Sequence, residues 1–281
     1  TYPILQNLGK NIILYVGIVL TAILVAVAIL APYIMPYDPT KMEISQKFIK
    51  PCAAHILGTD HLGRDILSRI ILGSRISLMT SVTAIFISAF IGTLLGIISG
   101  YLGGAVDTLI MRIVDVMLAF PAIVFALALS TVLGKGQTNL LIAICCVQWT
   151  RYARVARGET IMFRDSEYIQ AARAIGNSKT QIIKNYVFPA VISKIVILIS
   201  LDIGTIILYC ASLSFLGLGA QPPSPDWGVM ISEGKEYMQY APWVAIAPGI
   251  AIAFSALAFN MLGDGLRDLL DPRMKETVRT E

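Results

Sequence analysis

The sequence predicts an all-α integral membrane protein with six transmembrane helices. Of its 281 residues, 56% are hydrophobic and only 14% are charged, whereas a soluble domain carries about 25% charged residues. The mean hydropathy is +0.72, and the apolar residues form long uncharged blocks without the periodic polar faces of soluble helices and strands. This composition excludes a disordered chain, a coiled coil, a disulfide scaffold and an ordinary soluble enzyme.

The lengths of the apolar blocks predict where the chain crosses the membrane. A spanning helix needs about 20 mostly apolar residues, because ~30 Å of hydrocarbon is crossed at ~1.5 Å per residue. The fourth predicted span is apolar only as far as Trp149, and the fifth carries Lys194 and Asp202. The first block is too long for a signal peptide, whose apolar region spans about 7–15 residues, so we interpret it as a membrane anchor. The six predicted spans are residues 12–34, 76–100, 111–133, 139–160, 187–217 and 241–263.

The distribution of Lys and Arg predicts the orientation, because cytoplasmic loops carry an excess of these residues. With a cytoplasmic N-terminus, six crossings return the C-terminus to the cytoplasm. The inside segments then hold thirteen Lys and Arg residues and the outside segments eight. The chain accordingly divides into an N-terminal segment with the first span, an external loop, a core of five spans and a cytoplasmic tail, which are residues 1–37, 38–75, 76–267 and 268–281.

The four cysteines do not indicate a disulfide framework. Cys145, Cys146 and Cys210 lie within apolar blocks, and Cys52 stands in a polar stretch without a second cysteine. We expect these thiols to be small packing residues.

A predicted external stretch, residues 55–65, has residue patterns similar to those of two kinds of binding site. Gly58 and Gly63 have the spacing of a phosphate-binding P-loop, but Arg64 and Asp65 replace its lysine and hydroxyl residue. We therefore expect no nucleotide here. A metal site could form from the nearby imidazoles and carboxylates, but turn and cap roles explain the same residues, so we favour a structural element with a short helix capped at Thr59 or Asp60 and predict no metal. The residues considered as metal ligands are His55, Asp60, His61 and Asp65.

The stretch between the fourth and fifth predicted spans has the pattern of a helix–glycine–helix elbow. Residues 151–184, which include the end of the fourth span, carry seven basic and three acidic residues. A plain positive-inside loop that only fixes the orientation is the alternative interpretation. Asp165 can cap a first helix, with an apolar stripe at Ile169, Ala172 and Ile175 or Gly176. Gly176 then ends the helix, and Ser178 with Gln181 forms a capping-box pattern for a second. Finally, Pro189 interrupts that helix where the fifth span begins. Such an elbow is suited to docking against another protein.

This stretch resembles the "EAA" coupling motif of the membrane subunits of ABC importers. The matching residues are Gln170-Ala171-Ala172, then Gly176 after three residues, and Tyr186-x-Phe188-Pro189 after nine more. The sequence departs from the family pattern at Gln170 for Glu, Tyr186 for Ile and Phe188 for Leu, while the spacing is intact.

Further motifs are similar to the dipeptide, oligopeptide and nickel branch of these permeases. They occur in the family order and together cover roughly residues 12 to 275. The matching segments are His55-Ile56-Leu57-Gly58-Thr59-Asp60-His61-Leu62-Gly63-Arg64-Asp65, Arg112-Ile113-Val114-Asp115 with Phe120-Pro121, Ser214-Phe215-Leu216-Gly217-Leu218-Gly219, Trp227-Gly228, and Phe259-Asn260 with Gly263-Asp264 and Leu266-Arg267-Asp268.

The resemblance implies a permease subunit in the cytoplasmic (inner) membrane of a bacterium or archaeon. It implies a second homologous permease subunit, two ATPase subunits that use Mg-ATP, and an extracytoplasmic substrate-binding protein, with surrounding lipid and no nucleic acid. It further implies that this chain is not an enzyme and holds no cofactor, and that its cargo is a di- or oligopeptide, or nickel, free or chelated. The residues that it assigns to coupling with the ATPase are Glu167, Gln170, Ala171, Ala172, Arg173, Gly176 and Pro189.

Two further sets of charged residues lie in or near the predicted spans. Arg112 and Asp115 are spaced i, i+3, and we expect a structural ion pair. Asp202 lies inside the fifth span, where a carboxylate costs about 2.5 kcal/mol or more in lipid. It should therefore face a bundle interior, a partner or water, and a translocation-pathway role and a structural role are about equally supported.

Two other functions compete with the importer. In an ion-coupled secondary transporter Asp202 would titrate, but the sequence lacks the inverted repeat common in such proteins. A membrane enzyme ranks last, because the spans hold no catalytic constellation at useful spacing.

Overall fold

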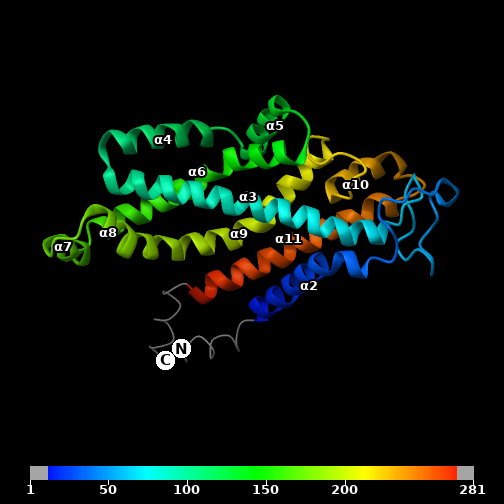
Figure 1. The fold of residues 1–281 in the computed structure, drawn as a ribbon, viewed down its shortest axis with the longest axis horizontal. Coiled ribbons are helices and arrows are strands. Elements are labelled where there is room, and N and C mark those ends of the chain that lie inside the picture. The colour runs from blue at the N-terminus through cyan, green and yellow to red at the C-terminus, as the bar shows by residue number, and fades with distance from the viewer. Residues whose placement is uncertain (1–11, 271–281) are drawn as a thin grey trace. The chain divides into compact units, whose positions relative to one another are not determined.

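A computed structural model describes residues 12–270, which fold into helices joined by loops (Figure 1). The described residues hold no β-strand, only an isolated bridge between Thr59 and Asp65. The ends of the predicted N-terminal segment and cytoplasmic tail lie outside the described residues. The α-helices are α2 (Ile12–Ile34), α3 (Ile66–Leu102), α4 (Gly104–Leu118), α5 (Ala122–Leu133), α6 (Gln137–Arg164), α7 (Glu167–Ala174), α8 (Lys179–Ile182), α9 (Phe188–Phe215), α10 (Trp227–Gly234) and α11 (Trp243–Leu270), with short helical turns at Ile44–Gln46, Ile183–Val187 and Lys235–Tyr237.

The chain forms two compact units that interleave along the sequence. Unit 1 consists of the described residues up to Thr83, together with Ser130–Ile142 and the described residues from Ser200 onward. Unit 2 consists of Ala84–Leu129 and Ala143–Ile199. Because α3, α5, α6 and α9 each contribute residues to both units, neither unit is a continuous segment of the chain.

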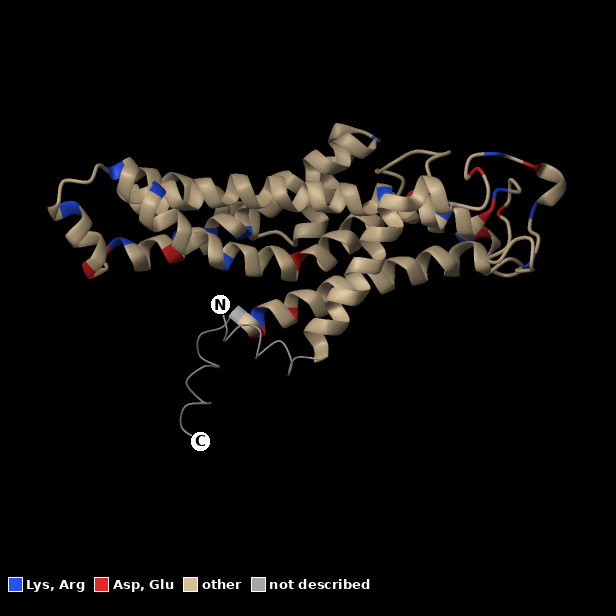
Figure 2. Cartoon of the chain, turned by 60° about the horizontal axis from the view of Figure 1, so that its bottom comes forward, with Lys and Arg blue, Asp and Glu red and all other residues tan. Residues whose placement is uncertain are grey.

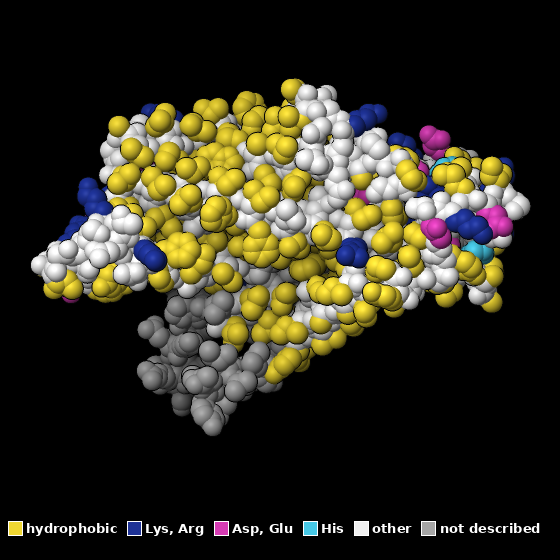
Figure 3. Space-filling view, in the orientation of Figure 1, with side chains coloured by type: hydrophobic (Ala, Val, Ile, Leu, Met, Phe, Trp, Pro, Cys, Tyr) yellow, Lys and Arg dark blue, Asp and Glu magenta, His cyan; other side chains and the backbone are white. Residues whose placement is uncertain are grey.

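The helices confirm an all-α fold with apolar membrane spans. Among the described residues, four helical stretches are long and apolar enough to cross a membrane, namely Ile12–Ile34, Ile66–Leu102, Lys179–Phe215 and Trp243–Leu269. Charged residues are sparse along these helices and gather in the turns and loops that join them (Figure 2). Large hydrophobic side chains lie exposed on the helix flanks (Figure 3), among them Phe90, which is 70% exposed. Exposed apolar surface of this kind is stable when it faces lipid.

The third predicted span is broken. Helices α4 and α5 meet at 93°, and together they count as one span only as a bent pair. The break at Ala119–Pro121 has a local cause, because Pro121 has no backbone N–H and disfavours helical geometry at the preceding residue.

Helix α6 has the length of a span but is not among the sufficiently apolar helices of the described chain. Its first half is apolar, whereas its second half carries Arg151, Arg154 and Arg157. The described chain thus contains four such helices, or five with the bent pair, and the count of six stays a prediction.

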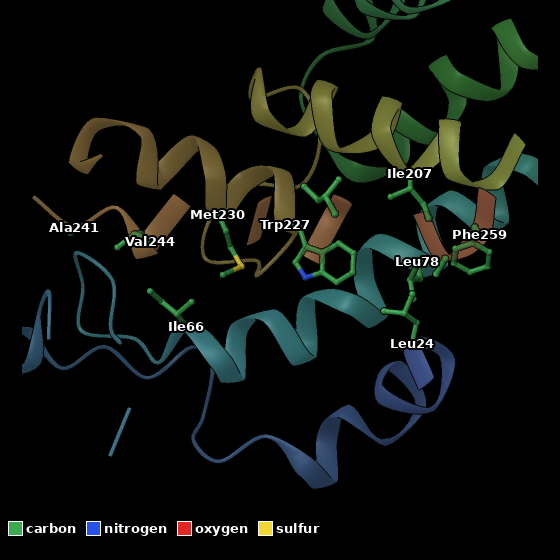
Figure 4. Close-up of a cluster of buried hydrophobic side chains, with 11 residues drawn as sticks. Leu24, Ile66, Leu78, Ile207, Trp227, Met230, Ala241, Val244 and Phe259 are labelled. Carbon is green, nitrogen blue, oxygen red and sulfur yellow. The ribbon is translucent and has the colours of Figure 1, made fainter. Parts of the chain in front are cut away.

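The core of unit 1 is built around Trp227, the first residue of α10. Its side chain is 1% exposed and packs with apolar residues of α2, α3, α9 and α11, including Leu24, Leu78, Ile207 and Phe259 (Figure 4). The indole Nε1 donates to the carbonyl of Ile70 at 3.1 Å. This packing fixes the short helix α10 against the longer helices.

In unit 2, α3 and α6 pack backbone to backbone along a line of glycines. Gly92, Gly96 and Gly100 are spaced four residues apart on α3. A Cβ added to Gly96 would overlap the carbonyl oxygen of Ala153 and lie 2.7 Å from the Cβ of Ala156. Small residues at this spacing allow helix backbones to approach closely in membranes.

Candidate functional site

The elbow in unit 2 begins with helix α7 after the end of α6. Its N-cap is Ser166 rather than the predicted Asp165, and the Ser166 hydroxyl donates to the carbonyl of Phe163 at 2.7 Å. The hydroxyl thus ties the N-cap to the last turn of α6, while the neighbouring Asp165 side chain lies near Arg164, with 3.3 Å between its Oδ1 and the arginine Nε.

Gly176 ends α7, as predicted. Its φ is +89°, a left-handed conformation that residues with a Cβ rarely adopt. The N–H of Asn177 donates to the carbonyl of Ala172 at 3.2 Å, which closes the C-terminus of the helix. The predicted capping box follows at Ser178 and Gln181, in which each side chain bonds the backbone N–H of the other residue.

The transition from the elbow into α9 differs from the prediction. Pro189 does not interrupt the helix, which continues from α8 through a single π-helical turn at Ile183–Val187. In that turn the N–H of Phe188 donates to the carbonyl of Ile183, five residues earlier. A proline has no backbone N–H, so one carbonyl of the preceding turn lacks its usual donor. The π-helical turn shifts the hydrogen bonds there, and the helix therefore continues through Pro189 without a break. The elbow is thereby continuous with a membrane span.

The predicted apolar stripe is only partly exposed. Ile169 and Ala172 are buried, at 0% and 4% exposure, whereas Ile175 is 78% exposed. Ala172 therefore packs inside unit 2 and does not belong to an accessible surface. The other residues assigned to coupling are exposed, and these are Glu167, Gln170, Ala171, Arg173, Gly176 and Pro189.

Two arginines of α6 form ion pairs with α4 in unit 2. Arg157 donates from Nε and Nη2 to the two oxygens of Asp107, at 2.5 and 2.6 Å. Arg154 lies 2.5 Å from Asp115 and takes the place that the sequence assigned to Arg112. Helical spacing allowed the Arg112 pair, but only the packing of α4 beside α6 shows that a cross-helix partner reaches Asp115.

Asp202 lies on α9 in unit 1 and is 5% exposed, in agreement with the expectation that it avoids lipid. The surrounding turns of α9 pack closely on α11. A Cβ added to Gly263 would lie 2.6 Å from the carbonyl oxygen of Ser200, and one added to Gly204 would lie 2.9 Å from that of Ala256. The helices thus enclose this carboxylate, and its role in a pathway stays a prediction.

The loop with the P-loop-like spacing is held together by hydrogen bonds of its own. The Asp60 carboxylate accepts the backbone N–H groups of Leu62 and Arg64 at 2.8 and 3.0 Å. His55 Nδ1 lies 2.8 Å from Asp65, whose second oxygen accepts the N–H of Ser68 and caps α3. The cap residue is therefore Asp65 rather than Thr59 or Asp60, and the carboxylates considered for metal binding serve as turn and helix-cap acceptors.

A buried charge network connects this stretch to α10. Glu233 accepts from Arg64 at 2.9 Å and from Arg69 at 3.0 Å, and Arg64 Nε also donates to Asp60 at 2.6 Å. The side chains of Arg64 and Arg69 are 0% and 1% exposed. Two arginines thus balance two carboxylates in the interior of unit 1.

Asp226 positions the start of α10 and so the place of Glu233. Its carboxylate caps the helix by accepting the N–H groups of Gly228 and Val229 at 3.0 and 3.2 Å, and it accepts the hydroxyl of Ser77 at 3.0 Å. Burial raises the pKa of Asp226 above its ordinary value, and these hydrogen bonds oppose that shift.

Sequence reasoning missed the buried network and the glycine line. Glu233 stands 164 residues after Arg69, so no local spacing joins them. The four-residue spacing of Gly92, Gly96 and Gly100 was a readable signal for helix contact. The four cysteines form no disulfide, as predicted, but only Cys145 and Cys210 are buried packing residues, whereas Cys52 and Cys146 are exposed.

Comparison with known families places this architecture among transport permeases. The family "Binding-protein-dependent transport system inner membrane component" matches residues 92–276, and "N-terminal TM domain of oligopeptide transport permease C" matches residues 4–51. The first match covers more than half of the chain and includes the elbow, α9 and α11. The chain belongs to this family of inner-membrane transport components and is a multi-pass membrane protein.

Relatives within the family cover most of the chain. It is 45% identical over 254 residues to a glutathione transport system permease protein GsiD of Pectobacterium atrosepticum, spanning 90% of this chain and 84% of that protein. It is 42% identical over 270 residues to the dipeptide transport system permease protein DppC of Alkalihalophilus pseudofirmus, spanning 96% and 89%. The GsiD of Escherichia coli O6:K15:H31 is 47% identical over 254 residues, spanning 90% and 84%.

Proposed function

We propose that this chain is one of two permease subunits in an ATP-driven importer, and that it carries peptide-class cargo across the inner membrane. The family and its named relatives support the transport class. The observation that carries the mechanism is the elbow, whose second helix α8 runs through the π turn into α9 without a break. Six of the seven assigned coupling residues are exposed on it.

The driving force comes from separate ATPase subunits that dock on this elbow. The loop at Gly58–Asp65 is no nucleotide site, because its carboxylates accept turn and helix-cap hydrogen bonds within the chain and it lacks the lysine of a P-loop. ATP binding favours the closed pair of ATPase subunits, and their closure moves the elbow as a rigid body. Because α8 runs through the π turn into α9, that displacement passes directly to a span. The chain itself then catalyses no reaction.

The cargo is a small peptide delivered by an external binding protein. The relatives named above transport glutathione or dipeptides, which share an α-amino group, a carboxylate and amide bonds. Asp202 is the pathway residue that could pair with a cationic group of the cargo as it passes. Transport of radiolabelled dipeptides and glutathione into proteoliposomes that contain the full complex would test this class, and uptake of nickel alone would contradict it.

The rival function, an ion-coupled transporter in which Asp202 titrates, is not favoured. A binding-protein-dependent system receives its cargo from a separate protein, and the elbow has no task in a carrier driven by an ion gradient. Uptake that persists when the ATPase subunits are inactivated would support the ion-coupled transporter instead.

The elbow is tested by an Ala171→Arg substitution in the assembled complex. Ala171 is exposed on α7, so the variant should fold, and a guanidinium in a packed interface should reduce ATPase-subunit binding at least tenfold, a cost of about 1.4 kcal/mol. Co-purification of the ATPase subunits and ATP-dependent uptake are the measurements. Ala105→Arg, at an exposed position of α4, is the matched control.

In this test, Ala105→Arg should retain both properties. Unchanged ATPase-subunit binding and uptake in Ala171→Arg would remove the elbow from the docking surface. Ala172→Arg is unsuitable, because Ala172 is buried and its replacement would disturb the packing of unit 2.

A further inference from the structure

A basic cleft in unit 2 lies where the elbow approaches the ends of α3 and α6. It encloses about 480 Å³, within the range of about 300–1,000 Å³ usual for ligand sites. Three of its lining residues are cationic and none is acidic. The residues that line the basic cleft are Tyr101, Leu102, Arg164, Arg173, Asn177, Lys179 and Ile182.

Neutral groups hold Arg173 of the basic cleft, whereas Arg164 bonds both to a backbone carbonyl and to the Asp165 carboxylate. Arg164 Nη1 donates to the carbonyl of Gly100 at 3.2 Å. Arg173 Nη2 donates to the carbonyl of Arg164 at 3.3 Å, and its guanidinium carbon lies 5.8 Å from the centroid of the Tyr101 ring. Backbone carbonyls and an aromatic ring orient a guanidinium without cancelling its charge.

Nearby carboxylates leave most of this charge uncompensated. Asp165 approaches Arg164 at 3.3 Å, but its side chain is 67% exposed, and exposed pairs of this kind contribute little. Arg157, about two helical turns before the end of α6, instead pairs closely with Asp107. Among the described residues, Arg173 and Lys179 of the basic cleft make no ion pair with a carboxylate, so the cleft keeps uncompensated positive charge.

The surroundings of the basic cleft indicate a lipid as the source of the anion. The cleft includes Tyr101 and Leu102 at the end of α3, a helix long and apolar enough to cross a membrane. At the ends of such helices, Tyr, Lys and Arg side chains occupy the interface between hydrocarbon and water. Leu102, which is 52% exposed, adds apolar surface beside the cations. A soluble anion gains nothing from that apolar surface, whereas a lipid presents a phosphate and acyl chains together.

We propose that the basic cleft binds the phosphate group of an anionic phospholipid from the cytoplasmic leaflet. Arg173 belongs to α7 and Lys179 to α8, so one headgroup contacts both helices of the elbow and a bound lipid fixes the elbow at the membrane surface. The inference goes beyond the proposed function, and lipid binding can be measured whether or not the complex transports.

The test compares lipid retention by native mass spectrometry of the purified complex in mixed phosphatidylglycerol and phosphatidylcholine. Lys179→Gln should reduce the preference for phosphatidylglycerol about fivefold, the effect expected of one basic residue near an anionic surface. Arg164→Gln combined with Lys179→Gln should reduce it about 25-fold. Lys184→Gln removes the same charge at an exposed elbow position outside the cleft, and should leave the preference unchanged.

Each outcome decides the proposal. Equal retention by the wild type and both cleft variants overturns it, as does an equal loss in Lys184→Gln, which would indicate general electrostatics.

Addition of inorganic phosphate separates the sources of the anion. Displacement of phosphatidylglycerol by millimolar phosphate would mark a site for soluble anions, and retention of the lipid supports the phospholipid. If complexes that contain the ATPase subunits retain no phosphatidylglycerol while complexes without them do, the cations of the cleft bind the ATPase subunits, and the proposal is overturned.

Discussion

The two units hold their helices together by opposite means. In unit 1, α10 is joined to α3 and the loop before it by a network of buried charges in which Glu233 pairs with Arg64 and Arg69. In unit 2, α3 meets α6 through Gly92, Gly96 and Gly100, with almost no side chain between the backbones. Charges are compensated in the first case and excluded from the contact in the second.

The comparison shows which charges are available for function. A buried arginine that is paired with carboxylates stabilises the fold and is not free to bind a ligand, because removal of one partner leaves an uncompensated buried ion. The cations of the elbow, such as Arg173 and Lys179, lie at the surface and lack such partners. The basic residues proposed here for ATPase docking or lipid binding are therefore those of unit 2 that no buried carboxylate compensates.

The largest effect is expected from breaking the charge network of unit 1. Glu233→Ala should lower the free energy of unfolding by about 3–5 kcal/mol, because two buried guanidinium groups lose their shared carboxylate. Thermal unfolding of the detergent-solubilised complex measures it. Glu236→Ala, three residues later at an exposed position, should have almost no effect. Equal melting temperatures for both variants would refute the network.

A smaller effect is expected from filling the glycine line of unit 2. Gly96→Ala should cost about 1–3 kcal/mol, because the added methyl group overlaps the backbone of α6. At Gly158 nothing lies within 4 Å of an added Cβ, so Gly158→Ala should be neutral or stabilise the helix by up to about 1 kcal/mol. Thermal unfolding distinguishes them, and a tolerated Gly96→Ala would mean that α3 and α6 are not in close contact.

The smallest effect is expected at the elbow, which is held by local caps. Ser178→Ala removes one hydrogen bond of the capping box and should cost about 1 kcal/mol. Hydrogen exchange of the amides in residues 178–187 should quicken, while the amides of α3 keep their protection. Exchange that quickens equally throughout both units would show that the elbow is not a separately stabilised element.

Local signals in the sequence predicted much of the fold. The apolar blocks located the long helices, and Gly176 and the Ser178 capping box were correctly placed because each acts on its own backbone within a few residues. The failures were also local. Ser166 rather than Asp165 caps α7, and Pro121 bends a predicted span. At the start of α7, two neighbouring residues had side chains suited to an N-cap, whereas Pro121 bends its span through its own backbone.

Contacts across helices were beyond prediction. Asp115 had an arginine at helical spacing, yet the structure pairs it with Arg154 of α6. Ala172 matched a docking stripe by periodicity, yet its side chain lies inside unit 2. Periodicity determines which residues share a face of one helix, but it does not determine which neighbour covers that face.

The sequence by itself determined that this chain is a helical membrane protein with an elbow between two long helices, because hydrophobic length and backbone capping act over short distances. The tertiary structure decided which charges are buried, which side of the elbow is exposed and where uncompensated cations gather. Those properties depend on residues far apart in the chain. Burial of a charge is costly, and the cost is offset only when tertiary packing brings a partner of opposite charge next to it.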